Sequence, residues 1–307
     1  MLTVVLGLGS ALGYALHDFL MVKVVRAAPV WTALTWSMGV GLLILLPLAL
    51  LIDGPPSGAA EWRAVGFATA SGVCEAAGLA CLLRGLVTGN LSIVTPLASL
   101  AGGFVAVITV AMGETLTPLA MIGLPLAVAG GLMASVEKAP KEEVFGLDEP
   151  VGTPADGRDA SQGAAVPARR TRATAGAGWA LLSSALFAVV VFLLAEATAL
   201  HPVALAAYGR LGTMVVLVPV ALLLAGLRLP RPLARRSAVA GVFDAAAFVA
   251  LAVAISLGPV AVASVVVSQG GTMAALLGLT FLRERLSRVQ YVGVACTCVA
   301  VALLATG

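Results

Sequence analysis

Three ionisable residues lie deep inside long apolar segments of the chain. Glu75 and Asp244 are near the middle of two such segments, and Arg210 lies about seven residues into a third. An ionised side chain at the centre of a bilayer costs roughly 2.5–3.5 kcal/mol on insertion scales, so residues of this kind are candidates for an internal site. Two carboxylates can bind a proton, a cation or an amine, and a guanidinium can hold a substrate carboxylate through two parallel hydrogen bonds.

Each of the three also has a purely structural interpretation. Glu75 and Asp244 can be neutral or hydrogen-bonded to a neighbouring helix and so only fix the packing. Arg210 can form a structural ion pair with either carboxylate, or extend its charge towards the membrane surface. The sequence leaves binding and structural roles open for all three residues.

Weaker candidates come from uncharged polar and aromatic side chains in other apolar segments. Ser268 and Gln269, and Thr95 in the other half of the chain, could offer hydrogen bonds to a cargo molecule, although polar packing between helices explains them equally well. Tyr14 and Trp36 could line a cavity for aromatic or cationic cargo. Aromatic residues near segment ends more often anchor a helix at the membrane surface.

Further charged residues lie close to the ends of apolar segments. We expect Asp18, which follows His17, to pair with Lys23 or Arg26, with a gating role as the alternative. Glu114 and Glu284 each precede an apolar segment, where a carboxylate can accept hydrogen bonds from the free backbone N–H groups of a helix N-terminus.

The composition identifies the apolar segments as membrane spans. Of the 307 residues 60% are hydrophobic and only 11% are charged, and the mean hydropathy is +1.06, whereas soluble proteins are roughly a quarter charged. At about 20 apolar residues per crossing, the chain divides into ten predicted spans. They are residues 2–22, 31–52, 63–84, 90–112, 117–136, 177–197, 203–226, 237–257, 259–281 and 287–306.

Two halves of five spans flank a central segment rich in Pro, Gly and charge. We predict a first repeat at 1–136, a disordered linker at 137–175 and a second repeat at 176–307. GVCEAA from Gly72 recurs as GVFDAA from Gly241, an offset of 169 residues, and GETLT recurs as RERLS at an offset of 170. This indicates an internal duplication, and Glu75 and Asp244 occupy equivalent positions in it.

An odd number of spans per half forces the second half to be inverted in the membrane. Lys and Arg gather in loops that lie on one predicted face, together with the linker, and positive residues favour the cytoplasmic side. The expected architecture is therefore an all-α polytopic membrane protein with ten transmembrane helices in two inverted five-helix repeats. Its location would be the cytoplasmic membrane, with both termini outside and the linker inside.

Several functional classes lack support in the sequence. His17 and His201 are the only histidines and both lie near span ends, which argues against an intramembrane enzyme. No Walker-type glycine-rich loop precedes a helix, and the four cysteines have neither zinc-site nor disulfide-scaffold spacing. We therefore expect no cofactor and no metal. A net charge of +3 is too small to indicate nucleic acid, and ten spans can enclose a cavity in a monomer or in each subunit of a homodimer.

Three stretches of the sequence resemble the EamA-like branch of the drug/metabolite transporter superfamily. They are SIVTPLASLAGG at 92–103, GETLTPLAMIGLPLAVAGG at 113–131 and ERLSRVQYVG at 284–293. The resemblance implies a secondary carrier that moves small metabolites, such as amino acids, amines or drug-like compounds, often outward, through a central cavity that opens alternately to either side. Two features depart from it: Ser37 stands where the first repeat would match Arg210, and the linker is long.

The leading functional hypothesis is a secondary active transporter for a small molecule, without ATP hydrolysis. Glu75 and Asp244 would couple transport to protons if coupling exists. The alternative is a membrane scaffold or assembly subunit that does not transport and that acts through the linker. Cargo, direction and driving ion do not follow from the residues.

Overall fold

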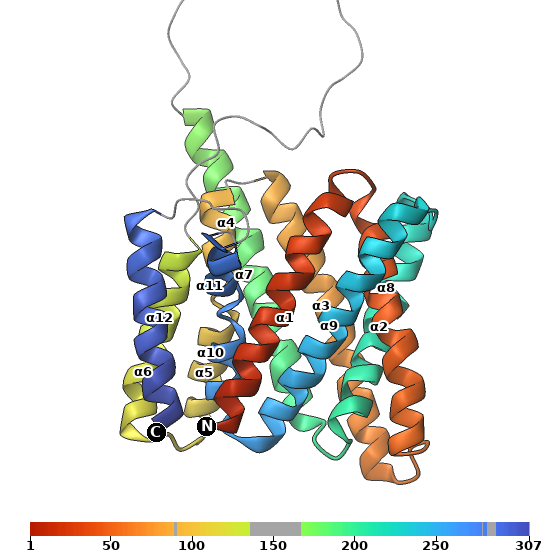
Figure 1. Cartoon of the computed structure of the whole chain (residues 1–307), viewed down its shortest axis with the longest axis horizontal. Helices are drawn as coiled ribbons and strands as arrows, with labels where there is room; N and C mark the ends of the chain where they lie inside the picture. Colours follow the sequence, from red (N-terminus) through yellow and green to blue (C-terminus); the bar gives the residue numbers. More distant parts are fainter. Residues whose placement is uncertain (89–90, 136–166, 278, 281–286, 307) are drawn as a thin grey trace, which may run out of the picture.

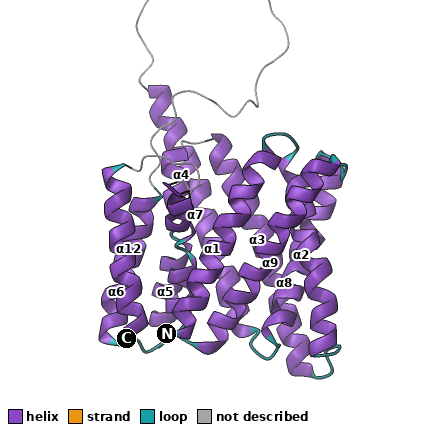
Figure 2. Cartoon of the chain, viewed as in Figure 1, coloured by secondary structure: helices purple, strands orange, loops and turns teal. Residues whose placement is uncertain are grey.

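A computed structural model describes residues 1–88, 91–135, 167–277, 279–280 and 287–306, and this part of the chain forms a bundle of helices with short connections (Figure 2). The first half of the chain contributes α1 (Leu2–Val25), α2 (Val30–Ile52), α3 (Ala59–Thr88), α4 (Leu91–Ala98), α5 (Ala101–Ala111) and α6 (Pro118–Ala134). The second half contributes α7 (Pro167–Glu196), α8 (Pro202–Leu224), α9 (Arg231–Leu257), α10 (Val260–Val267), α11 (Gly270–Leu277) and α12 (Arg288–Thr306).

Seven helices of the described chain are long and apolar enough to cross a membrane, namely α1, α2, α3, the 176–196 part of α7, α8, α9 and α12. Three further apolar stretches are shorter: Pro96–Ala111, Pro118–Ala134 and Val260–Ala274. The protein is thus a helical, multi-pass membrane protein.

Two predicted spans are not single helices. The span predicted at 90–112 divides into α4 and α5, with a turn at Ser99–Leu100, and the span predicted at 259–281 divides into α10 and α11, with a break at Ser268–Gln269. Pro96 precedes the first break, and paired glycines follow both breaks, which weakens the helix locally. Ser99 and Ser268 are equivalent positions in the sequence repeat, so the break recurs in both halves.

The start of helix α7 overlaps the end of the predicted linker. Helix α7 begins at Pro167, nine residues before the predicted start of the second repeat at 176. Proline is favoured at the first position of a helix because its missing N–H would be unpaired there anyway. Residues 136–166, the rest of the predicted linker, lie outside the described part. Helix α7 starts at the end of the bundle opposite to both chain ends (Figure 1).

The two halves are interleaved rather than side by side. Helix α3 packs on α7 and α8, and its repeat equivalent α9 packs on α1 and α2, which are the equivalents of α7 and α8. Helix α2 packs on α8 and α6 on α12, so each of these helices meets its own counterpart, while α5 packs on α10. Several of the largest contacts therefore have a partner contact in which the halves exchange roles.

Glycines permit the closest of these helix crossings. A Cβ atom at Gly72 on α3 would overlap the carbonyl oxygen of Gly209 on α8. At the equivalent position on α9, a Cβ at Gly241 would overlap the carbonyl oxygen of Ser37 on α2. Without side chains at these two points, the backbones approach closely, as is typical of small-residue contacts between membrane helices.

We predict that Gly72→Ala destabilises the bundle by about 1–3 kcal/mol, because the added methyl group must force α3 and α8 apart. Gly66→Ala is the matched control on the same helix, since a Cβ there meets no atom within 4 Å. The control should be neutral or slightly stabilising because alanine favours helix. Unfolding of the purified protein in detergent, followed by tryptophan fluorescence, measures both. Equal stability of the two variants would contradict the close crossing.

Candidate functional site

Two equivalent carboxylates project from the close helix crossings into the centre of the bundle. Glu75 follows Gly72 by one helical turn on α3, and Asp244 follows Gly241 by one turn on α9. Residues three apart lie on one face of a helix, so the glycine that admits the neighbouring helix also directs the carboxylate towards it. Both side chains are buried, with Glu75 8% and Asp244 2% exposed.

Arg210 on α8 joins these two carboxylates. Its Nη1 atom donates a hydrogen bond to Glu75 Oε2 at 2.5 Å, and its Nη2 atom donates to Asp244 Oδ1 at 2.9 Å. The guanidinium has no exposed surface. A buried charge of this kind is tolerated only with charged partners and good hydrogen bonds. The structure therefore brings together the three residues that the sequence ranked first.

Two further residues complete this site, which we call the Arg210 cluster (Glu75, Arg210, Thr213, Asp244 and Phe248). The Thr213 hydroxyl donates to Glu75 Oε2 at 2.7 Å, and the Phe248 ring lies 4.3 Å from the guanidinium carbon of Arg210. Sequence reasoning missed both. The available signal was spacing, because Thr213 follows Arg210 by three residues and Phe248 follows Asp244 by four.

The Arg210 cluster has unused hydrogen-bonding capacity among the described residues. Arg210 Nε has no hydrogen-bond partner there, and neither has Asp244 Oδ2, although this oxygen is also within ion-pair distance of Nη2 at 2.9 Å. With both carboxylates ionised, the one guanidinium leaves a formal charge of −1. This excess favours a bound proton or cation, while the guanidinium fork suits a carboxylate.

Tyr14 and His17 on α1 lie beside the cluster. Tyr14, one of the predicted site residues, is within electrostatic range of Arg210, Asp244 and Glu75. His17 is within range of Asp244 and Arg210. These positions follow from the packing of α1 along α9 (Figure 1).

Asp18 does not make the predicted ion pair with Lys23 or Arg26. Its Oδ1 atom lies 2.9 Å from Nδ1 of the adjacent His17. Lys23 and Arg26 follow Asp18 by five and eight residues, spacings that do not match the three or four residues that bring side chains together on a helix.

Ser268 and Gln269 lie at the break between α10 and α11. They form hydrogen bonds with groups around this break and not with the Arg210 cluster. Ser268 Oγ donates to the Val265 carbonyl at 2.8 Å. Gln269 Nε2 donates to the carbonyls of Ala127 and Val265, and its Oε1 accepts from Thr272 and Thr297. These four hydrogen bonds satisfy the Gln269 amide completely, and they connect the break between α10 and α11 with α6 and α12.

Trp36 is also not brought into the cluster. Trp36 is 39% exposed and donates its indole N–H to the carbonyl of Leu227, in the connection between α8 and α9. It therefore holds a loop at the end of the bundle, as an anchoring tryptophan does. Thr95 belongs to α4, but its side chain lies outside the described part of the structure.

Glu114 binds a helix N-terminus in the opposite half of the chain. Its two carboxylate oxygens accept hydrogen bonds from the backbone N–H groups of Val260 and Ala261, at 2.5 and 3.0 Å. A carboxylate stabilises the positive end of a helix in this way. The sequence predicts such a role but gives no indication that the helix would be α10. Its equivalent, Glu284, lies outside the described residues.

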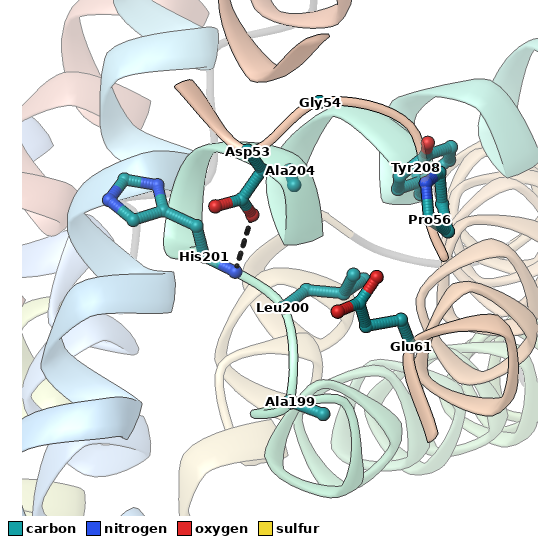
Figure 3. Close-up of a pocket in the computed structure, with 9 residues that line it drawn as sticks. All are labelled: Asp53, Gly54, Pro56, Glu61, Ala199, Leu200, His201, Ala204 and Tyr208. Carbon is teal, nitrogen blue, oxygen red and sulfur yellow. Dashed lines mark hydrogen bonds between the residues drawn. The ribbon is translucent and has the colours of Figure 1, made fainter. Parts of the chain in front are cut away.

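A separate cavity of about 100 Å³ opens between the α2–α3 and α7–α8 connections, at the same end of the bundle as both chain ends (Figures 1 and 3). It is lined by Asp53, Gly54, Pro56, Glu61, Ala199, Leu200, His201, Ala204 and Tyr208. Asp53 accepts a hydrogen bond from the backbone N–H of His201 at 3.0 Å, so its carboxylate ties the two connections together. None of the cluster residues lines this cavity.

Comparisons with known proteins agree with this architecture. The model of the EamA-like transporter family matches residues 1–136 and 174–306. One solved structure, titled only as the crystal structure of a protein, is similar with a TM-score of 0.73 and 12% identity, over 99% of this chain and 97% of the other. At that identity the likeness concerns the fold alone. No functionally curated protein matches the sequence.

We predict that Thr213→Val destabilises the protein by roughly 1.5–3 kcal/mol, because it removes a hydrogen bond to the buried Glu75 carboxylate while keeping the side-chain shape. Thr109→Val is the control, since Thr109 is also buried but donates only to the carbonyl of Ala106 on its own helix, at 3.4 Å. Thermal unfolding of the purified variants compares them. A loss for Thr109→Val as large as that for Thr213→Val would show that Thr213 has no special contact with the cluster.

Proposed function

Because the chain belongs to the EamA-like transporter family, we propose that it is a secondary active transporter that moves a small metabolite across the cytoplasmic membrane by alternating access. The cargo would be an amino acid, an amine or a drug-like compound, and transport would be outward. The Arg210 cluster would be the binding site for the cargo or for a coupling proton.

The observation that carries this proposal is the ion-paired cluster shared between the two halves. Glu75 comes from the first half, and Arg210 and Asp244 come from the second, so the contact between Arg210 and Glu75 spans the interface between them. Ionisable groups buried within membrane helices are expensive and typically mark a transport pathway. A site at the interface of two repeats is also where secondary transporters bind their substrates.

The exchange of contacts between equivalent helices supports an inverted repeat with ten membrane segments. In this interpretation α4 with α5 and α10 with α11 each form one interrupted segment, and α6 and α12 are the last segment of each half. Interrupted helices are frequent in transporters with inverted repeats. Both chain ends would face outward and the linker inward, following the distribution of Lys and Arg.

Cargo binding at the cluster would require one ion pair to be exchanged. A substrate carboxylate could replace Asp244 or Glu75 on the guanidinium of Arg210, and a substrate amine could replace Arg210 at a carboxylate. Either exchange weakens the contact between α8 and one of the helices α3 and α9. A ligand shifts a conformational equilibrium only through such differences in binding between the two states.

We expect Glu75→Gln and Asp244→Asn to abolish the metabolite differences that the wild-type protein produces, because each leaves Arg210 with one charged partner. The measurement is metabolite profiling of cells and medium for strains with wild-type protein, each variant and an empty vector. Glu196→Gln is the matched control, because Glu196 is an exposed carboxylate at the end of α7. The expected loss is about tenfold or more, which corresponds to one interaction of 1.4 kcal/mol.

The same measurement, with one further strain that lacks part of the linker, distinguishes transport from the scaffold alternative. If the protein acts through its linker, deletion of residues 141–163 is disabling, whereas Glu75→Gln and Asp244→Asn are tolerated. If it transports, the deletion is tolerated and the cluster variants are not. Membrane levels of every variant are measured by immunoblot. Full activity of both cluster variants would overturn the proposed site.

A further inference from the structure

His17 on α1 connects the surface of the bundle with its centre. The imidazole is buried, with a side chain 7% exposed, whereas the Asp18 side chain is 76% exposed. His17 Nδ1 lies 2.9 Å from Asp18 Oδ1, and His17 Nε2 lies 3.1 Å from the Ser37 hydroxyl oxygen on α2. Both ring nitrogens are therefore engaged, one by a surface carboxylate and the other by a buried hydroxyl group.

The hydrogen bonds determine the state of the ring. An ionised Asp18 only accepts hydrogen bonds, so Nδ1 carries a hydrogen and donates it. Neutral His17 then accepts a hydrogen bond at Nε2 from the Ser37 hydroxyl, which can be donor or acceptor. When His17 binds a second proton at Nε2, the Ser37 hydroxyl turns to accept it. Protonation thus needs no rearrangement beyond the rotation of one hydroxyl group.

The same side of α1 and α2 faces Asp244. A Cβ at Gly13, one turn before His17, would lie 2.8 Å from Ala247 Cβ on α9. A Cβ at Gly41, one turn after Ser37, would lie 3.9 Å from Asp244 Oδ2, the carboxylate oxygen without a hydrogen bond among the described residues. His17 therefore lies at the junction of α1, α2 and α9, close to the helix segment that carries Asp244.

The charged groups around His17 come from few helices. Asp18 is on α1, the helix of His17 itself, whereas Asp244 is on α9 and Arg210 is on α8. Arg235 and Arg236, near the start of α9, line a groove with Leu20, one turn beyond His17. Helices α2, α10 and α11 contain no ionisable side chain, and α12, which touches α1, begins with Arg288.

We propose that His17 is a proton-binding site linked to Asp244, and that it is the point at which protons reach the Arg210 cluster from the Asp18 side. The proton comes from water and binds the Nε2 lone pair, and no other bond forms or breaks. An imidazolium at His17 would offset the formal −1 charge of the cluster and leave Arg210 free to bind a substrate carboxylate. This deepens the transporter function proposed above, because it names the proton as the coupling ion.

The test is nuclear magnetic resonance of the full-length protein labelled with ¹⁵N-histidine, in lipid nanodiscs, between pH 5 and pH 9. The chain has two histidines, and His201→Gln assigns their signals. We expect Asp244→Asn to move the midpoint of the His17 titration to lower pH by about half a unit or more, because a carboxylate that favours the imidazolium has been neutralised. Glu75→Gln, which reduces the same negative charge, must move it in the same direction if Asp244→Asn does not fold.

Asp53→Asn is the matched control. Asp53 binds the backbone of His201, so this variant should change the His201 signal and leave the His17 midpoint in place. The proposal is overturned if His17 does not titrate in this range, or if neither cluster variant moves its midpoint. The result is independent of cargo: a metabolite exported by a protein whose His17 does not respond keeps the transporter function and removes the proton link. If His17 responds but no metabolite is exported, the proton site stands and the transporter function is removed.

Discussion

A guanidinium without exposed surface in the middle of an apolar bundle sets the central constraint on this protein. Arg210 cannot remain charged there without anionic partners, and the two that it has are on different helices. Removal of one partner of a buried ion pair costs more than the pair contributes, because a charge is left without compensation. The relative positions of α3, α8 and α9 are therefore fixed by one side chain.

The glycines next to the carboxylates follow from this constraint. Gly72 lets the backbone of α3 touch that of α8, which carries Arg210, one turn before Glu75. Gly241 lets the backbone of α9 touch that of α2 one turn before Asp244. Gly-x-x-Glu in α3 and Gly-x-x-Asp in α9 occupy equivalent positions of the two halves. This explains why both helices make a close crossing one turn before their carboxylate. The cluster is not symmetric between the halves, because Ser37, which lies within hydrogen-bond distance of His17, stands where the other half has Arg210.

The sequence predicted the parts of this arrangement that depend on polarity in an apolar setting. Glu75, Asp244 and Arg210 were identifiable because charges within apolar segments are rare and costly, and the repeated motif related two of them. Thr213 and Phe248 could not be recognised because threonine and phenylalanine are ordinary in membrane helices. Trp36, Ser268 and Gln269 were candidates for a cavity on residue type alone, with anchoring or helix packing as the alternative. Trp36 and Gln269 have partners from distant parts of the sequence that only the packing brings near, and Ser268 binds a carbonyl of its own helix.

Helix boundaries were predictable to within a few residues where hydropathy changes sharply, as at the C-terminal ends of α2 and α9. The breaks inside two predicted spans were not, because hydropathy does not distinguish one long helix from two short ones with glycines between them. The partner of Glu114 was also beyond prediction, because it lies 146 residues further along the chain at Val260.

The central claim is that Arg210 and Glu75 hold the two halves together through a direct interaction, and a double-mutant cycle tests it most directly. Free energies of unfolding in mixed detergent would be measured for wild type, Glu75→Gln, Arg210→Met and the double variant. We predict that the double variant loses less stability than the sum of the single losses, with a coupling on the order of 1–3 kcal/mol. Glu196→Gln combined with Arg210→Met should be additive, and additivity of the Glu75→Gln and Arg210→Met losses would contradict the claim.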